Sequence, residues 1–392
     1  MFLLQTVDSF VLNIALFAVL ASVVGVFFSK IKQPYIIGYI LIGAFAGHYG
    51  LGIVDQPDLI HASGEIGIVL LLFFIGMEVD LKDLVSKWRL SLMGTIIQVL
   101  ISVFVIYAIG QFFNWSFERA LIIGFVISLS STAVSIRLLE DKGLLRTQVG
   151  KNVLSVLLAQ DIIIVPLLLI TSFIGGAKTD KSDYLMMIIG GVVVLTVLLL
   201  LLFKKNIHLP FAKRIMREKE LQVFAAILFC FGGALLTSFF NLSAALGAFI
   251  GGMAINRARE TGWIQNTLHS FRVLFVALFF ISIGLQLNFD FLLNNAWMLL
   301  GAVAAVFLLN QLINTSILKV FGIPRDEALL GGAYLAQIGE LSFLIAATAF
   351  SLGIKSQFAY NFTISLISLT LVISPFWIAL IERFAKKIKE VK

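Results

Sequence analysis

The sequence predicts an all-α membrane protein with thirteen transmembrane helices, built as two inverted six-helix repeats whose interrupted helices cross. Three observations lead to this prediction. Hydrophobic residues make up 60% of the 392 residues and charged residues only 13%, about half the charge that covers a soluble domain. Apolar stretches of about 20 residues, the length that crosses a bilayer, recur along the chain. Two of these stretches resemble two later ones in the same order.

The composition also excludes several classes of protein. The single cysteine, Cys230, excludes a disulfide framework, and the four histidines are too widely spaced to form a metal-binding pair on one helix. The net charge of +7 comes from Lys and Arg between the apolar stretches, which indicates membrane topology and not nucleic-acid binding. Neither a GxGxxG after a strand nor a Gly-x-Ser-x-Gly is present, so we expect no cofactor and no enzyme activity.

Thirteen stretches are predicted to span the membrane. They cover residues 8–29, 34–51, 62–79, 88–113, 117–138, 148–174, 184–204, 218–240, 242–256, 268–287, 291–320, 326–352 and 356–384. The first stretch lacks the basic start and the small-residue cleavage site of a signal peptide, so we expect it to remain as a transmembrane helix.

An odd number of spans places the two termini on opposite sides of the membrane. With the N-terminus outside, nearly all of the 29 Lys and Arg residues fall on the inner side, as the positive-inside rule requires. The exceptions are Arg119, Lys178, Lys181 and Lys355. We therefore expect a multi-pass protein of the cell (inner) membrane with a cytoplasmic C-terminus.

The chain resembles itself over an offset of about 206 to 209 residues, an unlikely coincidence for two pairs of segments in the same order. The run PYIIGYILIGAFAG from Pro34 aligns with SAALGAFIGGMAI from Ser243. The run LFFIGMEVDLKDL from Leu72 aligns with LFFISIGLQLNFDFL from Leu278. The first six and the last six spans therefore form two repeats, with the seventh span as a linker.

This alignment pairs Gly43 with Gly252 and Gly76 with Gly284. In the topology above, the matching spans run in opposite directions through the membrane, so the repeats are inverted. Inverted repeats place a binding site near the bilayer midplane, on interrupted helices. The pattern therefore favours a transporter that works by alternating access.

Polar residues interrupt the fifth and twelfth spans, which occupy equivalent places in the two repeats. The fifth contains the run SLSSTAVS, with Ser130, Ser131 and Thr132 at its middle, and hydroxyl groups can satisfy the backbone of a broken helix. The twelfth contains AYLAQIGELSF, with Gln337 and Glu340. We expect both helices to break here and to face half-helix ends toward each other. The alternatives are a small-residue packing seam for the first run and a structural buried acid for Glu340.

Asp161 is the strongest single candidate for an ion site. It follows Gln160 in the apolar run VLSVLLAQDIIIVPLLLI, near the middle of the sixth span, where a charge is costly. Pro166 can free carbonyl oxygens of the same helix. Lys151 lies roughly 15 Å away along the helix, which argues against a packing ion pair. A carboxylate holds either a proton or a dehydrated monovalent cation, and competition for one site is sufficient to couple the two ions in exchange.

In these motifs the sequence resembles the cation:proton antiporter-2 family, Kef-type branch. The matching runs are LFFIGMEVD, SLSSTAVS, LLAQDIIIVPL, ALFFISIGLQLNF and AQIGELSF, and in this order they cover nearly the whole chain. The resemblance implies a core unit that carries the ion and a dimerisation unit that stays fixed while the core moves as an elevator in a homodimer. The expected segments are 1–87 and 217–289 for dimerisation helices, 88–176 and 290–385 for core helices, 177–216 for the linker and 386–392 for a basic cytoplasmic tail.

The resemblance also implies Gln160 and Asp161 as the ion-site pair. Sodium-type relatives commonly carry two acids there, so a single acid suggests electroneutral exchange of one cation for one proton and favours potassium. Many relatives carry a Lys in the eleventh span, where this sequence has Asn310, so Asp161 is expected to act without a basic partner. The expected site consists of Asp161 with Gln160, Ser130, Ser131 and Thr132 as ion-binding residues, supported by Asn310, Glu340 and Gln337.

The sequence therefore predicts a secondary active monovalent cation:proton antiporter, with K⁺/H⁺ exchange favoured. Na⁺/H⁺ exchange and channel-like potassium efflux of the Kef type are the alternatives, although no TVGYG filter motif supports a channel. Kef-type proteins often continue into a nucleotide-binding regulatory domain, whereas this chain stops at Lys392. A cytoplasmic regulatory domain or subunit is thus a candidate partner outside this chain, besides the lipid bilayer and a second copy.

Overall fold

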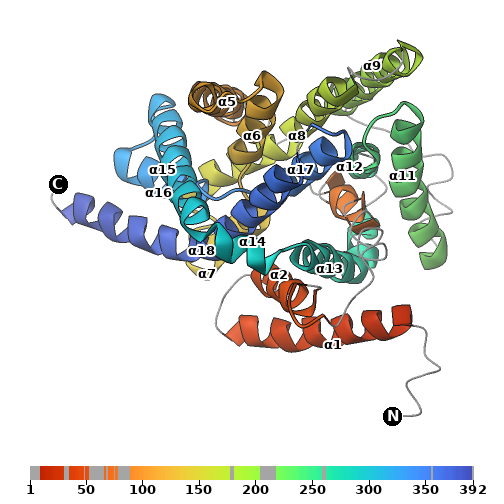
Figure 1. Cartoon of the computed structure of the whole chain (residues 1–392), viewed down its shortest axis with the longest axis horizontal. Coiled ribbons are helices and arrows are strands. Elements are labelled where there is room, and N and C mark those ends of the chain that lie inside the picture. Colours follow the sequence, from red (N-terminus) through yellow and green to blue (C-terminus); the bar gives the residue numbers. More distant parts are fainter. Residues whose placement is uncertain are drawn as a thin grey trace.

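Every regular element of the described chain is a helix (Figure 1). The computed structural model describes residues 9–30, 35–47, 49–52, 66–67, 69–74, 76–77, 89–176, 181–203, 218–257, 262–354 and 356–390. Of the 18 residues of the third predicted span, 62–79, ten are described (66–67, 69–74 and 76–77), and all ten are helical. The all-helical prediction is therefore confirmed.

Most predicted spans correspond to one helix each. These helices are α1 (Ser9–Lys30), α2 (Tyr35–Ala46), α8 (Gln148–Gly176), α9 (Lys181–Phe203), α11 (Lys219–Phe239), α12 (Ala244–Arg257), α13 (Gly262–Leu285) and α18 (Gln357–Glu390). The prediction of 34–51 for the second span was too long, because α2 ends at Ala46 and a turn follows at 49–51.

Three predicted spans are divided, and a fourth begins with a π-helical turn that runs directly into its α-helix. Their parts are the π-helical turn η2 (Arg89–Met93) with α5 (Gly94–Phe112), α6 (Phe117–Ser128) with α7 (Thr132–Asp141), α14 (Phe289–Asn294) with α15 (Ala296–Val320), and α16 (Arg325–Tyr334) with α17 (Leu341–Ser351). The breaks within the fifth and twelfth spans are those that the polar runs predicted. The division of the eleventh was not predicted; the side chain of Asn288 caps α14, and α15 begins directly after Asn295.

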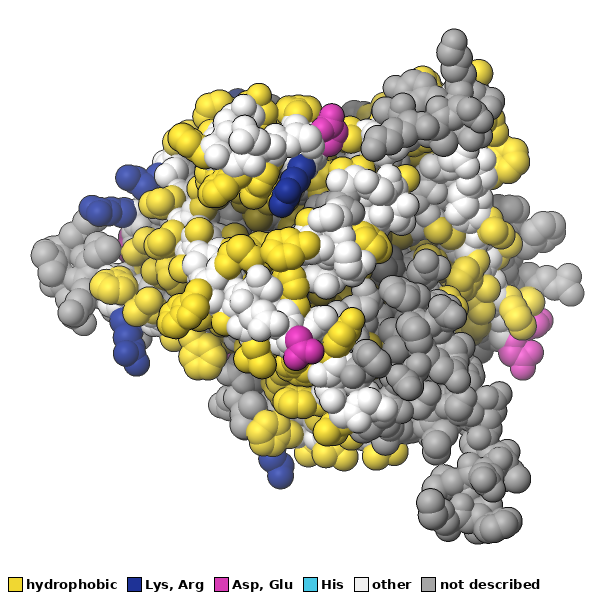
Figure 2. All heavy atoms as spheres, in the orientation of Figure 1, with side chains coloured by type: hydrophobic (Ala, Val, Ile, Leu, Met, Phe, Trp, Pro, Cys, Tyr) yellow, Lys and Arg dark blue, Asp and Glu magenta, His cyan; other side chains and the backbone are white. Residues whose placement is uncertain are grey.

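The exterior of the described part suits a bilayer. Hydrophobic side chains cover much of the coloured surface in Figure 2. Five helices are long and apolar enough to cross a membrane, namely the η2–α5 segment, α8, α11, α15 and α18, among the residues that the structure describes. Most of α8 is buried, whereas α11 is largely exposed. Helix α8, which carries Asp161, therefore lies inside the bundle, where it contacts α6, α7, α16 and α17.

The two glycine pairs of the internal repeat each mark a close helix contact. Helix α2 packs on α13 so closely that a Cβ atom on Gly43 would overlap the carbonyl oxygen of Ile281. In the same contact, a Cβ atom on Gly284 would overlap the carbonyl oxygen of Ile40.

The second contact repeats the first between the equivalent segments. A Cβ atom on Gly252 of α12 would overlap the carbonyl oxygen of Phe73, and one on Gly76 would overlap that of Phe249. Each residue lies 208 or 209 positions from its counterpart in the first contact, for example Phe73 from Ile281. The same backbone-to-backbone contact is therefore made twice, which confirms the internal repeat.

We expect Gly43→Ala to lower the apparent melting temperature in detergent, because its new methyl group has no space against α13. Overpacking of this kind typically costs about 1–3 kcal/mol. Gly301→Ala on α15 is the matched control, since nothing lies within 4 Å of a Cβ atom there and alanine favours a helix by about 1 kcal/mol over glycine. Equal melting temperatures for the two variants would contradict the packing argument.

Candidate ion-binding site

The two broken helices meet at their breaks. The first break separates α6 from α7 at residues 129–131, and the second separates α16 from α17 at 335–340. The backbone N–H of Gly339 donates to the carbonyl oxygen of Leu129 at 2.7 Å, and Ser130 Oγ donates to the carbonyl oxygen of Leu335 at 2.7 Å. A Cβ atom on Gly339 would lie 2.5 Å from the carbonyl carbon and oxygen of Ser130, so the close approach requires glycine.

Side chains from other helices satisfy the carbonyl groups at the end of α6. Ser342 Oγ donates to the carbonyl oxygen of Val126 at 2.6 Å. Asn310 Nδ2 donates to that of Ile127 at 2.8 Å. Gln98 Nε2 donates to that of Ser128, also at 2.8 Å. Interrupted helices are tolerated at membrane depth only when their freed backbone groups find such partners.

The second break is satisfied in the same manner. Asn314 Nδ2 donates to the carbonyl oxygen of Leu335 at 3.1 Å, and Asn310 Nδ2 donates to that of Ala336 at 3.1 Å. Asn310 therefore bridges the two breaks, which gives a physical role to the residue that stands where many relatives were expected to carry a lysine. Its Oδ1 atom is buried without a hydrogen-bond partner among the described residues, and so is Gln337 Oε1.

Two buried acids face the start of α7. Thr132 Oγ1 donates to Asp161 Oδ1 at 3.1 Å, and Ser131 Oγ donates to Glu340 Oε2 at 2.6 Å. Asp161 is 5% exposed and Glu340 is 6% exposed, and the two carboxyl groups are close enough to interact electrostatically. Ser131 is the N-cap of α7, whose N-terminal end favours negative charge. The structure therefore brings Glu340, expected only to support the site, beside Asp161.

Gln160 and Ser130 hold the broken helix rather than face the two acids. Gln160 Oε1 accepts from the backbone N–H of Ser130 at 2.8 Å, while Gln160 Nε2 donates to Gln98 Oε1 at 2.9 Å. Gln337 Nε2 donates to Ser135 Oγ at 2.8 Å and to the carbonyl oxygen of Tyr334 at 3.0 Å. Of the predicted ion-binding residues, Asp161, Ser131 and Thr132 therefore cluster with Glu340.

Four contributing residues were not among the predicted site residues. They are Gln98, Ser135, Asn314 and Ser342, which bond to the two breaks or to residues that hold them. Gln98 and Asn314 are polar residues in the middle of apolar spans, and this is the signal that could have identified them. In contrast, Arg137 pairs with Asp141 at 3.4 Å, and Lys142 pairs with Glu382, at the ends of helices rather than at the crossing.

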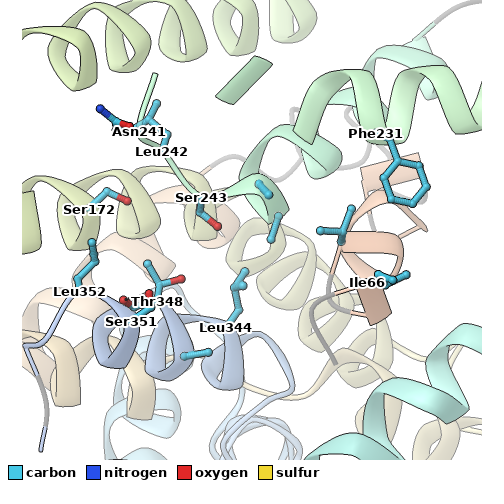
Figure 3. Close-up of a pocket in the computed structure, with 14 residues that line it drawn as sticks. Ile66, Ser172, Phe231, Asn241, Leu242, Ser243, Leu344, Thr348, Ser351 and Leu352 are labelled. Carbon is cyan, nitrogen blue, oxygen red and sulfur yellow. Dashed lines mark hydrogen bonds between the residues drawn. The ribbon is translucent and has the colours of Figure 1, made fainter. Parts of the chain in front are cut away.

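A cavity of about 490 Å³ lies next to this cluster of helices but does not include Asp161 (Figure 3). Ser172 of α8 lines it together with Thr348 and Ser351 of α17. The opposite wall includes Ser243 and the residues around the turn from α11 to α12. The cavity therefore separates helices of the expected core unit from helices of the expected dimerisation unit.

Buried acids at two crossing helix breaks, in an all-helical membrane fold with an internal repeat, are the arrangement expected of a membrane transporter of ions. The family model for "Sodium/hydrogen exchanger, transmembrane" matches residues 15–382. The chain belongs to this family.

The chain is also similar to individual members of curated protein sets. It is 32% identical to the iron transporter MagA of Paramagnetospirillum magneticum over 369 residues, which cover 94% of this chain and 85% of MagA. It is 26% identical to YbaL of Escherichia coli, a candidate cation/proton antiporter, over 380 residues, which cover 94% of this chain and 68% of YbaL.

Solved structures show the same fold. The sodium proton antiporter MjNhaP1 from Methanocaldococcus jannaschii at pH 8 superposes with a TM-score of 0.69 over 95% of this chain and 97% of that chain. An electron-microscopy structure of MjNhaP1 gives a TM-score of 0.62 over 95% and 96%. The sequence identity is 19% in both cases, so this likeness describes the fold alone.

We expect Asn310→Leu to destabilise the protein, because it leaves the carbonyl groups of Ile127 and Ala336 without their Nδ2 donor. Each buried group left unpaired costs about 1–3 kcal/mol. Thermal unfolding in detergent measures the loss. Asn294→Leu, at an exposed position of α14, is the control and should unfold close to the wild-type temperature. An Asn310→Leu protein as stable as this control would remove Asn310 from its bridging role.

Proposed function

We propose that the protein exchanges potassium for protons as an antiporter of the Kef-type branch, with one cation moving against one proton. The observation that supports this most directly is the buried Asp161 carboxylate beside the Thr132 hydroxyl at the helix break. A proton and a dehydrated cation each neutralise this carboxylate, and each excludes the other. Occupation by one ion on one side of the membrane and by the other ion on the opposite side gives coupled exchange.

The residues at the start of α7 have separate tasks in this exchange. Asp161 carries the charge that attracts either ion. The hydroxyl of Thr132 donates to Asp161 and can instead turn an oxygen lone pair toward a bound cation. The hydroxyl of Ser131 can offer a lone pair while it continues to donate to Glu340. The buried carbonyl oxygens of Asn310 and Gln337 are further neutral acceptors near the crossing. Oxygen ligands of this type suit alkali cations, which bind hard donors.

Potassium is proposed over sodium on the resemblance to Kef-type proteins, which carry Gln-Asp where this chain has Gln160 and Asp161. Na⁺/H⁺ exchange is the first alternative. Iron is the second, because Asp161 and Glu340 together could balance a divalent charge, and because the relative MagA is named an iron transporter. The described residues contain no cluster of three or more His, Cys, Asp and Glu that would complete a tighter metal site.

Transport would proceed by an elevator movement of the core, 88–176 and 290–385, against the dimerisation unit, 1–87 and 217–289, with 177–216 as a linker. The cavity between α8, α17 and the α11–α12 turn supports this division, because it lies between the two units. The proposed assembly is a homodimer in the inner membrane, with the N-terminus outside and the C-terminus in the cytoplasm.

We expect Asp161→Asn to abolish cation-driven proton movement in liposomes while the protein stays folded. Asparagine keeps the shape of aspartate but neither exchanges a proton nor neutralises a cation. Lumenal pH is followed after K⁺, Na⁺, Li⁺, Rb⁺ or Fe²⁺ gradients are imposed, so the same measurement ranks the cations. Asp290→Asn, at an exposed position of α14, should exchange as the wild type does. Retained exchange in Asp161→Asn would exclude this carboxylate as the site, and a wild type driven only by Na⁺ or Fe²⁺ would exclude potassium.

We expect the exchange rate to be independent of membrane potential, because Asp161 trades one positive charge for another while Glu340 stays bound to Ser131 throughout the cycle. Exchange driven by a pH gradient, with equal K⁺ on both sides, is compared with and without a membrane potential set by a gradient of a permeant anion such as thiocyanate. Glu340→Gln should leave the result unchanged. A rate that follows the potential in the wild type but not in Glu340→Gln would show that Glu340 also changes its protonation state.

A further inference from the structure

Gln98 is the buried polar residue of α5 that reaches the break between α6 and α7. Much of α5 faces outward, with Leu100 and Phe104 largely exposed, whereas the Gln98 side chain is 1% exposed. A buried amide carries two donors and one acceptor group that need partners. The bonds of Gln98 therefore show what this position does for the site.

The amides of Gln98 and Gln160 form a closed set of hydrogen bonds with the broken helix. Gln98 Nε2 donates to the carbonyl oxygen of Ser128 at 2.8 Å. Gln160 Nε2 donates to Gln98 Oε1 at 2.9 Å and to the same Ser128 oxygen at 3.3 Å. Gln160 Oε1 accepts from the backbone N–H of Ser130 at 2.8 Å. Both amides are thus tied to the residues on either side of the break.

These bonds fix the orientation of both amides. The Ser128 carbonyl can only accept, so it selects the NH₂ end of Gln98 and leaves the Gln98 oxygen for Gln160. The Ser130 N–H can only donate, so it selects the oxygen of Gln160. Rotating the Gln160 amide by 180° would place its NH₂ against the Ser130 N–H and its oxygen against the Gln98 oxygen. Both contacts would then be repulsive, and Gln98 thereby excludes the rotated state.

We infer that Gln98 is a positioning residue that sets cation affinity and selectivity through Gln160, without touching the ion. Gln160 and Asp161 are consecutive on α8, and both bond to the break, at Ser130 and at Thr132. A shift of the 128–130 segment against α8 therefore changes the distance from Thr132 Oγ1 to Asp161. The distances between the oxygen atoms that would surround a dehydrated cation, among them those of Asp161 and Thr132, decide which cation fits. This inference rests on the proposed exchange function.

The test replaces Gln98 with methionine, which has a similar volume and neither the donor nor the acceptor. Fold stability should be largely kept, because Gln160 Nε2 still reaches the Ser128 oxygen. We expect the apparent KM for the transported cation to rise about tenfold, the size expected for one lost hydrogen bond. Turnover at saturating cation should stay near that of the wild type, which is the pattern of a binding effect. The ratio of KM values for K⁺ and Na⁺ should change as well.

A double-mutant cycle that combines Gln98→Met with Gln160→Met measures how strongly the effects of the two residues on KM depend on each other. Because both residues act through the same bonds, the double variant should raise KM no more than the larger single effect. Gln111→Met, exposed on the same helix, is the matched control and should keep wild-type KM and selectivity. If Gln98→Met fails to fold, Gln98→Asn is tested in the same way. The asparagine side chain keeps the amide but is one methylene shorter, so it cannot reach both the Ser128 carbonyl oxygen and Gln160.

The outcomes separate this inference from the proposed function. A wild type without cation-driven proton movement would overturn the function itself. A functional wild type with unchanged KM and selectivity in folded Gln98→Met or Gln98→Asn would overturn the role of Gln98. Additive effects of Gln98→Met and Gln160→Met, or a lower turnover at unchanged KM, would also overturn it, because they indicate only structural support. A raised KM with altered selectivity and no additivity supports it.

Discussion

The structure depends on hydrogen bonds to the backbone groups that two broken helices leave unpaired inside the bundle. Ser342, Asn310 and Gln98, from three different helices, donate to three consecutive carbonyl groups at the end of α6. An unpaired polar group at this depth costs several kcal/mol, so each of these carbonyl groups has to keep a donor. The positions of α5, α15 and α17 around the break are therefore mutually fixed. Asp161 receives its hydroxyl partner only because this arrangement places Thr132 against α8.

Local patterns allowed the breaks and the repeat to be predicted. Hydroxyl groups concentrated in the run SLSSTAVS have few uses inside a bilayer other than bonding backbone groups, and α6 ends at Ser128 as expected. The glycine pairs were visible because a repeated backbone contact needs glycine in both copies, as at Gly43 and Gly252. Asp161 was identified because a lone acid in an apolar helix is costly. The breaks and Asp161 are thus signalled within a few residues of chain, and the repeat by comparing two short runs of sequence.

The remaining features depend on contacts between distant segments. Glu340 lies beside Asp161 only because the second break crosses the first, and its own surroundings in the sequence fit a structural acid equally well. The sequence also left the bonding of Gln160 undetermined, since a glutamine next to an aspartate could point at an ion or at a backbone group. Its partner Gln98 is 62 residues away on another helix. No periodicity or motif relates the two positions.

Gln160 and Asn310 are both uncharged at positions where some relatives were expected to carry a charge. Sodium-type relatives were expected to carry two acids on the sixth span, and many relatives a lysine on the eleventh; two acids with one lysine amount to one negative charge. Here Gln160 replaces one acid and Asn310 replaces the lysine, so the same net charge remains with Asp161. Both amides still donate to the backbone of the breaks, as the bonds from Asn310 to Ile127 and from Gln160 to Ser128 show. Two amides in place of a charged pair avoid the desolvation cost of two ions, and in this chain they also donate hydrogen bonds that hold the crossing together. In the proposed exchange, Asp161 then carries the charge that an ion neutralises, while Glu340 is held by the hydroxyl of Ser131.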